Sequence, residues 1–325
     1  MKVLIDVSFA RRGPSGTQVY VDHLIAALRA LGVDVAEAEG RRGRHLNLAA
    51  EALWQARLAR ASQRCDVLHH PLPARAPTRT PQVITVHDLA FLRVPECFNA
   101  RFRAVVARRH RAAARAAAAI VCPSQATAGD VRALWGREDA VVAPHGPGQA
   151  PPPSRGEARH FLYVGDGEPR KNLPRLLAAY ARYRAGAEVP LDLVLAGRAQ
   201  VPPASGVRLD PSPQFAELHR HAAALVLPSL HEGFGLPALE AMHAGTPVLA
   251  ADIPALREVC VEAARYADPR DVGALTAGLT ELATIPPLRE ELRRRGTARA
   301  AAFSWERSAR QHLVAYERAR NLDGA

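Results

Sequence analysis

The sequence predicts an α/β protein built from two doubly wound, Rossmann-like domains, each with a parallel sheet. Short apolar runs alternate with segments of helical periodicity along the whole chain, which is the pattern of βαβ units. The length of 325 residues suits two domains of about 150 residues each. A proline- and glycine-rich stretch near the midpoint, residues 146–155, is the best candidate for a linker.

Apolar runs in the first half predict five short strands, at residues 2–7, 67–70, 83–87, 120–122 and 140–143. Apolar side chains recur with helical spacing from Val21 to Leu28, which predicts an amphipathic helix that Gly32 ends. A second amphipathic helix is marked by Phe98, Phe102, Val105 and Val106. Between Gly32 and Asp66 we expect little more than one strand and one helix, so this half is short.

The second half repeats the alternation, with strands expected at residues 161–165, 191–196, 224–227 and 248–251. Helices are expected at residues 173–183, 213–222, from 237 onward, 254–260, 270–283, 288–301 and 305–320. Doubly wound sheets bind ligands beyond the carboxyl ends of their strands, so residues directly after strands are the first candidates for a site.

The chain is basic, with a formal charge of +11 and a pI of about 10.3. Nearly all of this charge is arginine, because Lys2 and Lys171 are the only lysines. Such a skew, together with abundant alanine and proline, resembles base-composition bias, so we discount part of the charge as a sign of a partner. Residues 101–115 hold many arginines but only Phe102 as an aromatic residue, which disfavours nucleic acid. We interpret this segment as a helix with a solvated or membrane-facing basic side.

Four cysteines lie far apart, without the spacing of a zinc or redox site, which is typical of a reducing cytosol. The N-terminus does not resemble a signal peptide, because its apolar run is short and broken by Asp6. No stretch approaches the length of a membrane span. We therefore expect a cytoplasmic protein, with any membrane contact peripheral at the inner face.

The strongest local motif is residues 228–250, PSLHEGFGLPALEAMHAGTPVLA. Glu232 follows a strand, and Pro237 stands in the first turn of a helix that carries Glu240. Two glutamates in these places can hold two parts of one polyol ligand. Backbone N–H groups at the helix start can bind an anion or a sugar oxygen, and they belong to Phe234, Gly235 and Leu236. A tight turn with a dipole-stabilising glutamate is the alternative, and we prefer it for Glu232 alone but not for the whole motif.

The second motif, residues 165–173 (GDGEPRKNL), begins at Gly165 after another strand. Asn172 is the expected N-cap of the next helix, which places Arg170 and Lys171 at a helix N-terminus. Two cations beside a positive dipole end repel each other unless an anion neutralises them, and a diphosphate is suited to do so. A solvated basic turn is the alternative, but the use of one of only two lysines here argues against it.

Two weaker candidates lie in the first half. His87 ends a strand and either contacts a sugar hydroxyl or the phosphate–sugar region, or is a structural histidine. Gly16, in the loop of residues 13–17, would let the backbone approach phosphate, although the loop matches a dinucleotide motif only weakly. His69 and His70 also end a strand, and we interpret them as structural.

Four stretches together resemble the family 4 glycosyltransferases, which have the GT-B fold. In chain order they are ITVHDLAFLRVPECF at 84–98, EPRKNLPRLLAAYARY at 168–183, PSLHEGFGLPALEAMHAGTPVLAADIPALREV at 228–259 and FSWERSARQHLVAYERA at 303–319. They span most of the chain and are most similar to the mannosyltransferase-like branch.

The resemblance implies two Rossmann-like domains that face a central cleft. Residues 1–148 would form the acceptor-side domain, 149–158 the linker and 159–304 the domain that binds the nucleotide sugar. The last helix, residues 305–325, would pack back on the first domain.

The resemblance also implies roles for the candidate residues. Arg170 and Lys171 would bind the donor diphosphate, and Glu232 would hold hydroxyls of the donor sugar. His87 would lie beside the anomeric centre, and Glu240 would bind the ribose. Backbone contacts to the donor would come from Gly16, Gly165, Phe234, Gly235 and Leu236.

Members of this family retain anomeric configuration and commonly work without a metal. The sequence agrees, because its nearest match to an Asp-x-Asp metal motif is Asp166-Gly167-Glu168 in the phosphate turn. We expect no cofactor and no metal, with a nucleotide sugar as donor, GDP-mannose before a UDP-sugar. The acceptor hydroxyl would attack on the face from which the diphosphate leaves, and the leaving phosphate would take the proton. The acceptor, which could be a glycan, a lipid-linked saccharide or a small molecule, stays open.

Two alternatives remain at this point. The chain could be another GT-B sugar-nucleotide enzyme, such as an epimerase, hydrolase or phosphorylase, although a pyridoxal-dependent phosphorylase would need a placed lysine beyond Lys171. It could also be a non-catalytic basic binding protein, which would keep its binding after Glu232 and Lys171 are both changed to alanine.

Overall fold

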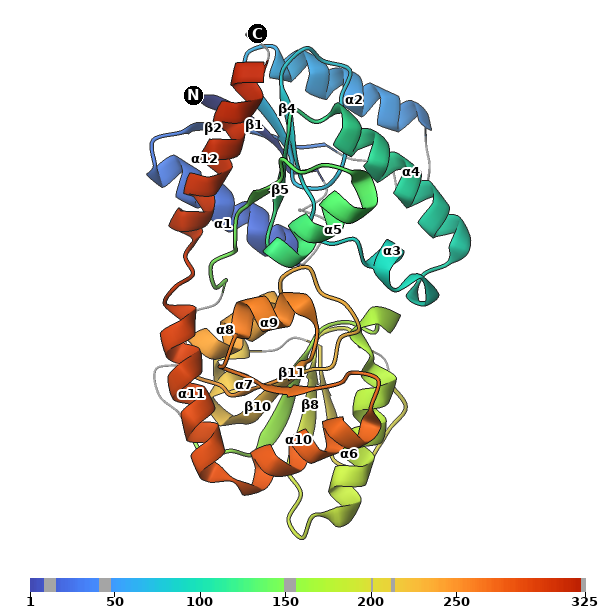
Figure 1. The fold of residues 1–325 in the computed structure, drawn as a ribbon, viewed down its shortest axis with the longest axis vertical. Coiled ribbons are helices and arrows are strands. Elements are labelled where there is room, and N and C mark those ends of the chain that lie inside the picture. The colour runs from blue at the N-terminus through green and yellow to red at the C-terminus, as the bar shows by residue number, and fades with distance from the viewer. Residues whose placement is uncertain (9–15, 41–47, 149–155, 200, 212–213, 323–325) are drawn as a thin grey trace. The chain divides into compact units, whose positions relative to one another are not determined.

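The computed structural model describes residues 1–8, 16–40, 48–148, 156–199, 201–211 and 214–322. Most of the candidate linker (149–155) and of the glycine loop (13–15) therefore lies outside the described residues. The chain divides into two compact units (Figure 1). Unit 1 contains Met1–Leu92, Asn99–Gly148 and Ser304–Ala325, and unit 2 contains Arg93–Phe98 and Gln149–Phe303.

Unit 1 is built on six parallel strands in the order β2-β1-β3-β4-β5-β6. The strands are β1 (Lys2–Asp6), β2 (Asp34–Ala38), β3 (Val67–His70), β4 (Gln82–Thr85), β5 (Ala119–Cys122) and β6 (Val141–Val142). Its helices are α1 (Gly16–Ala30), α2 (Leu48–Ser62), α3 (Ala90–Arg93), α4 (Ala100–Ala116), α5 (Gln125–Trp135) and α12 (Trp305–Leu322). The short helix η2 (Pro95–Cys97), between α3 and α4 in the chain, belongs to unit 2.

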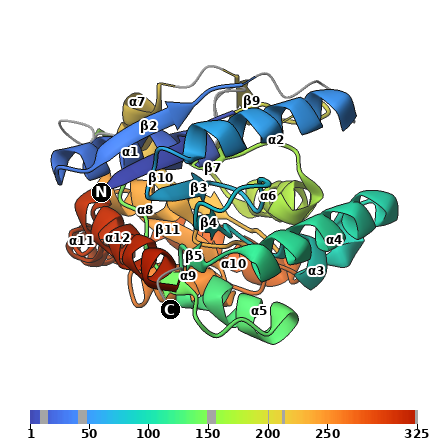
Figure 2. The ribbon, with the colours of Figure 1, turned by 90° about the horizontal axis from the view of Figure 1, so that it is seen from above.

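Helices cover both faces of the unit 1 sheet because its strands are apolar on both sides. In β1, Val3 and Ile5 join a core that α1 and α12 complete, while Leu4 points into a second core with Trp54 and Leu58 of α2. Figure 2 shows α1 and α12 on one side of these strands and α2, α4 and α5 on the other. The last helix of the chain is thus part of the first core.

Unit 2 is built on six parallel strands in the order β12-β11-β10-β7-β8-β9. They are β7 (His160–Val164), β8 (Asp192–Ala196), β9 (Val207–Asp210), β10 (Ala222–Leu227), β11 (Val248–Ala251) and β12 (Arg265–Ala267). The helical segments are η3 (Pro169–Lys171), α6 (Leu173–Gly186), α7 (Phe215–His221), α8 (Leu236–His243), α9 (Pro254–Cys260), α10 (Val272–Thr284) and α11 (Pro286–Ala300).

The winding of unit 2 places the functional motifs. From β7 the chain proceeds outward through β8 to β9 and then returns to β10 on the other side of β7. The carboxyl ends of β7 and β10 therefore flank the point where the strand order reverses, which is where doubly wound sheets bind ligands. The turns after these two strands carry the motifs that the sequence singles out.

The predicted fold class, two doubly wound parallel sheets, is confirmed. The prediction missed the edge strands β9 and β12, the helices α3 and α5, and the short helical segments η2 and η3. The edge strand β9 has no buried position, so its sequence lacks an apolar run. β4 ends at Thr85, so the strand predicted over 83–87 is too long and His87 lies beyond it. Within the described ranges, no helix is both long enough and apolar enough to cross a membrane.

Candidate functional site

The turn after β7 carries the two cations of the second motif. The N–H of Gly165 donates to Ala196 at 3.0 Å, and the N–H of Lys171 donates to Glu168 at 2.9 Å. Gly197, at φ 124°, lies against this turn, where an added Cβ would stand 2.4 Å from the Gly165 carbonyl oxygen. Only glycine fits there, so Gly197 allows the turn after β7 to lie close to the end of β8. The sequence alone did not reveal this role.

Asn172 links this turn to two others, and it does not act as the cap that the sequence predicts. It stands at the N-cap position of α6, but its backbone is left-handed (φ 59°) and its side chain makes no capping bond. Its buried Nδ2 instead donates to the carbonyls of Pro228 at 2.9 Å and Pro269 at 2.6 Å. The side chain thereby ties the turns after β7, β10 and β12 together.

We expect Asn172→Ala to lower the free energy of unfolding by about 3 kcal/mol, because two buried carbonyls lose their donor and alanine disfavours the left-handed backbone. Asn172→Gly removes the same bonds but accepts the backbone, so it should cost roughly 1 kcal/mol less. Urea unfolding of both variants measures the difference. Equal losses would show that the left-handed backbone is no constraint here.

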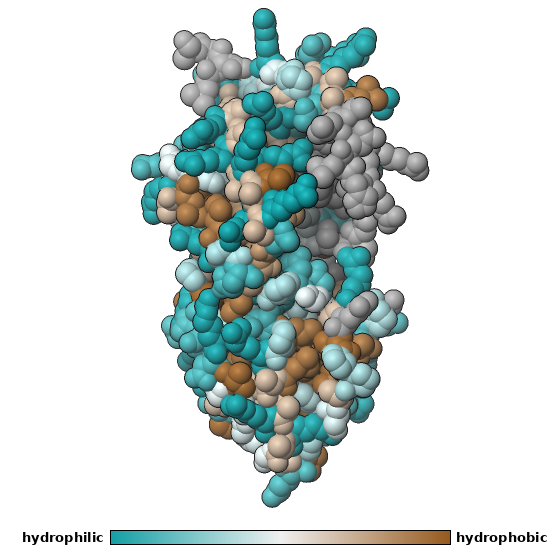
Figure 3. Space-filling view, turned by 90° about the vertical axis from the view of Figure 1, so that its right-hand side faces the viewer, coloured by the Kyte–Doolittle hydropathy of each residue, from teal (hydrophilic) through white to brown (hydrophobic). Residues whose placement is uncertain are grey.

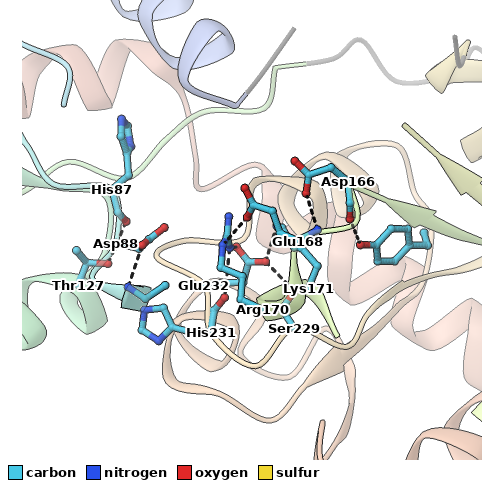
Figure 4. A network of polar contacts seen from close by, with 12 residues as sticks. His87, Asp88, Thr127, Asp166, Glu168, Arg170, Lys171, Ser229, His231 and Glu232 are labelled. Carbon is cyan, nitrogen blue, oxygen red and sulfur yellow. Dashed lines mark hydrogen bonds and ion pairs between the residues drawn. The ribbon is translucent and has the colours of Figure 1, made fainter. Parts of the chain in front are cut away.

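The carboxylate of Glu232, after β10, meets both cations (Figure 4). Lys171 Nζ lies 2.7 Å from Glu232 Oε1, and Arg170 Nη1 lies 3.6 Å from Glu232 Oε2. Ser229 Oγ donates to Glu232 Oε1 at 2.8 Å, and Arg170 Nε also pairs with Glu168 at 2.8 Å. From the sequence we expected a bound ligand to supply the anion that neutralises these cations. The structure instead shows two protein carboxylates beside the two cations. Glu168 lies in the same turn as the cations, and Glu232 is brought there because β7 and β10 are neighbours.

The environment of Glu232 keeps it ionised. Its side chain is only 9% exposed, and burial raises the pKa of its carboxyl, but the charges of Lys171 and Arg170 lower that pKa more. Hydrogen bonds from Lys171 and Ser229 add to the lowering, and the resulting pKa is about 2. Glu232 is therefore an acceptor of hydrogen bonds at neutral pH.

The turn that follows Glu232 starts α8 as the sequence predicts. Gly235 is the N-cap at φ 95°, and an added Cβ would stand 2.4 Å from Leu256. Phe234 is buried with its ring edge against Phe303, 5.8 Å between centroids. The N–H groups of Ala238 and Leu239 donate to the carbonyl of Gly235 at 2.9 and 3.2 Å. The dipole of α8 favours negative charge at this end. Glu240 lies in the second turn of α8 and is half-buried.

His87, in unit 1, is a neutral imidazole. Burial lowers its pKa to about 4, although the charge of Asp88 and a hydrogen bond to the backbone of Pro71 raise it in part. Its ring meets Tyr20 edge-on at 4.8 Å between centroids. Its Nε2 is buried, and within the described parts of the chain it has no hydrogen-bond partner. A buried nitrogen of this kind is suited to a polar ligand group.

Beside His87 runs a chain of hydrogen bonds whose direction can be derived. His312 Nδ1 lies 2.8 Å from the carbonyl of Ser308, which can only accept, so Nδ1 carries the proton. Burial lowers the pKa of His312 to about 4, so Nε2 is unprotonated and accepts from the Tyr20 hydroxyl at 2.8 Å. Because the Tyr20 hydroxyl donates its one proton to His312, its oxygen accepts a hydrogen bond from Thr85 Oγ1 at 2.7 Å.

The chain continues to the helix that closes unit 1. Thr85 has given its proton to Tyr20, so it accepts from His69 Nε2 at 2.8 Å. Burial lowers the pKa of His69 well below its usual range, so Nδ1 accepts from the Tyr316 hydroxyl at 2.8 Å. His69 is thus structural, as expected, and α12 is bonded at His312 and Tyr316 to the middle of the unit 1 core. The sequence carried no signal for this network, because its members lie up to 292 positions apart.

The remaining candidate, Gly16, begins α1, and an added Cβ there would meet nothing within 4 Å. The rest of its loop lies outside the described residues. Among the residues that the structure describes, no three histidine, cysteine, aspartate or glutamate side chains converge to hold a metal ion.

Two protein-family models together match most of the chain. The model described as "Glycosyltransferase Family 4" matches residues 14–148, and the model described as "Glycosyl transferases group 1" matches residues 149–299.

Curated relatives match over part of their length. The chain is 35% identical over 173 residues to O-antigen chain mannosyltransferase B of Escherichia coli. The match covers 49% of this chain and 45% of that protein. The chain is 36% identical over 170 residues to MMP alpha-(1->4)-mannosyltransferase of Mycolicibacterium hassiacum, covering 46% of this chain and 41% of that protein. The matched region thus spans less than half of each relative.

Solved structures match along the whole chain. Sucrose-phosphate synthase from Thermosynechococcus elongatus has a TM-score of 0.78 at 18% identity and covers 98% of both chains. Anabaena Alr3699/HepE, solved in complex with UDP and glucose, has a TM-score of 0.73 at 16% identity, covering 97% of this chain and 98% of the other. These likenesses show the fold, and the family models show the kinship. The chain therefore belongs to the family 4 glycosyltransferases, has their GT-B fold, and counts mannosyltransferases among its relatives.

Proposed function

We propose that this protein is a retaining hexosyltransferase that moves a sugar from a nucleoside diphosphate to a hydroxyl group of an acceptor. The observation that carries the proposal is the group formed by Arg170, Lys171 and Glu232 at the carboxyl ends of β7 and β10. It puts two cations and an ionised hydrogen-bond acceptor in one place, as a sugar diphosphate requires.

Each candidate residue has a part in this proposal. Arg170 and Lys171 bind the diphosphate, and Glu232 accepts hydrogen bonds from hydroxyls of the donor sugar. Glu240 binds the ribose, and His87 presents its neutral ring to the sugar near the anomeric carbon. Backbone contacts come from Gly16, Gly165, Phe234, Gly235 and Leu236.

In the proposed reaction the acceptor oxygen forms a bond to the anomeric carbon while the bond to the diphosphate oxygen breaks. Both events take place on the same face of the sugar, so the configuration is retained. The leaving phosphate takes the proton of the acceptor hydroxyl. Arg170 and Lys171 stabilise the charge that develops on the diphosphate, a role that a metal ion has in other enzymes. We propose that no metal or cofactor is needed.

We propose GDP-mannose as the first donor to test and UDP-sugars as the second. The first choice is supported by mannosyltransferases among the relatives, including the two named above, and the second by the UDP bound to Alr3699/HepE. A glycan is the acceptor class supported by O-antigen chain mannosyltransferase B. The proposed compartment is the reducing cytoplasm, which is supported by all four cysteines being free.

Thermal unfolding with a panel of nucleotide sugars tests the proposal. At a concentration of about 100 times Kd, a donor stabilises the folded protein by roughly 2.7 kcal/mol and raises its Tm. The rise should vanish in Lys171→Ala and persist in Lys2→Ala, the matched control, because Lys2 makes only an exposed pair with Asp34. No rise with any nucleotide sugar or nucleoside diphosphate would overturn the proposal.

Product analysis separates the other reactions. An epimerase would change the donor without releasing diphosphate, and a hydrolase would release sugar at the same rate with and without acceptor. A strict requirement for Mn²⁺ would refute the metal-free mechanism. Undiminished donor binding by a protein with both Lys171→Ala and Glu232→Ala would place the ligand elsewhere and favour a non-catalytic binding protein.

A further inference from the structure

Helix α4 of unit 1 has a composition that the proposed transferase site does not use. It runs from Ala100 to Ala116 and carries six arginines and no acidic residue in 17 positions. Other exposed arginines of this protein have acidic partners on their own helix, as Arg294 and Arg295 do with Glu291 in α11. Helix α4 itself supplies no acidic residue to pair with its arginines.

Both ends of α4 are fixed, so the helix presents one defined face outward. Asn99 caps the start, its side chain accepting from the N–H groups of Arg101 at 2.9 Å and Phe102 at 3.3 Å. At the other end Arg137 donates to the carbonyls of Ala114 and Ala117. Because these contacts hold the rotation of the helix, its outer face is a structural feature of unit 1.

The inner face of α4 carries two buried alanines and His110, whose ring packs against Phe91 at 5.5 Å between centroids. Ala113 and Ala114 are buried against unit 1. The sequence had marked this helix by Phe102 and Val105, but these side chains are 54% and 45% exposed. These two apolar side chains therefore lie on the outside of the helix.

The outer face of α4 combines apolar and cationic side chains. Residues three or four positions apart on a helix are neighbours on its surface. Val105 has such neighbours on both sides, namely Arg101, Phe102, Arg108 and Arg109. The exposed arginines of the helix are Arg101, Arg108, Arg109, Arg111 and Arg115. Figure 3 views unit 1 from the side on which α4 lies and shows small hydrophobic patches among hydrophilic side chains.

We propose that this outer face, the α4 face, docks the protein on the surface of an anionic phospholipid bilayer. Its arginines would lie at the level of the lipid phosphates, and Phe102 and Val105 would enter the boundary between headgroups and acyl chains. A helix lying in the interface in this way needs both an apolar strip and a cationic flank. Nucleic acid would satisfy the arginines but would give Val105 no apolar partner, so lipid fits this face better.

Sedimentation of the full chain with vesicles tests this surface. We expect binding to phosphatidylcholine vesicles that contain phosphatidylglycerol, little binding to pure phosphatidylcholine, and weaker binding as salt is raised. The double substitution Arg108→Gln with Arg111→Gln should weaken binding about thirtyfold, because each arginine near an anionic surface contributes roughly fivefold. The control Arg294→Gln with Arg295→Gln removes the same charge from α11 and should leave binding unchanged.

The apolar part of the proposal has its own pair of variants. Phe102→Ser should weaken vesicle binding, while Val189→Ser, at a position that is 87% exposed in unit 2, should not. Circular dichroism and the thermal shift with nucleotide sugars show whether each variant is folded and still binds donor, so that a failed transferase proposal is not confused with a failed membrane proposal.

Three results would overturn the proposal. Equal losses from the α4 and α11 arginine pairs would show a general effect of net charge. Equal binding to neutral vesicles would remove the role of the arginines. Binding to a single-stranded RNA that depends on Arg108 and Arg111 but not on Phe102, without binding to vesicles, would assign the face to nucleic acid instead.

Discussion

Replacing Lys171 with alanine is expected to lower kcat/KM for sugar transfer between about a hundredfold and a thousandfold, the range found when one group that stabilises developing charge is removed. The variant loses a cation from the diphosphate and also leaves the carboxylate of Glu232 without its partner at 2.7 Å. Because both groups are nearly buried, we also expect unfolding to become easier by roughly 3 kcal/mol. Initial rates and urea unfolding measure the two effects separately.

Lys2→Ala is the matched control, since Lys2 is the only other lysine and its pair with Asp34 is long, 3.8 Å, and exposed. Glu232→Gln separates the effect on catalysis from the effect on stability. The amide keeps the shape of the side chain, and Lys171 is still present to bind the diphosphate. The double variant Lys171→Ala with Glu232→Gln should lose less stability than the sum of the single variants, because the two side chains are in contact. Full activity in Lys171→Ala would refute the assigned role of this residue.

Acidification between pH 6.5 and pH 4 is expected to destabilise unit 1 strongly. His312 and His87 each have a pKa of about 4 in the folded protein, against about 6.5 in the unfolded chain. Between these values the unfolded chain binds more protons, so stability is complete above about pH 7 and falls as the pH drops. Each shift of about 2.5 units corresponds to roughly 3 kcal/mol, and the buried His69 and His145, whose pKa values are also lowered, add to the loss.

Glu232, whose pKa is about 2 in the folded protein, adds to the loss of stability as the pH falls towards and below the ordinary carboxyl pKa of 4.5. This contribution is the same in the wild type and in a histidine variant, so it cancels when the two are compared. Urea unfolding at a series of pH values gives the slope of stability against pH. His312→Gln keeps a polar side chain but cannot take a proton, so its slope near pH 5 should be shallower by about 1.4 kcal/mol per pH unit. An unchanged slope would mean that His312 is already protonated in the folded protein or that α12 detaches before unfolding.

The two-sheet architecture follows from the sequence because buried parallel strands are short apolar runs, and most strands of this protein are buried along their length. The same reasoning fails at the edges of the sheets, where β9 exposes its side chains. It also fails at α4, where the packing of Ala113 and Ala114 turns Phe102 and Val105 outward.

The candidate site could be predicted in its parts but not in its contacts. Residues after β7 and β10 were identified because strand ends and glycine turns are readable in a sequence. The pairing of Lys171 with Glu232, 61 positions away, follows from strand order, which one sequence does not display. Asn172 resembled a helix cap because asparagine often is one, and only the structure shows that its side chain serves two carbonyls elsewhere.

The position of α12 has a consequence for how the protein is made. The chain leaves unit 1 after Gly148, builds unit 2, and returns at Ser304. A nascent chain that has left the ribosome only as far as residue 303 therefore contains all of unit 2, while the core of unit 1 still lacks Ala315, Tyr316 and Ala319. Although domains commonly fold in the order of synthesis, here the unit that begins first must wait for the last helix before its core closes.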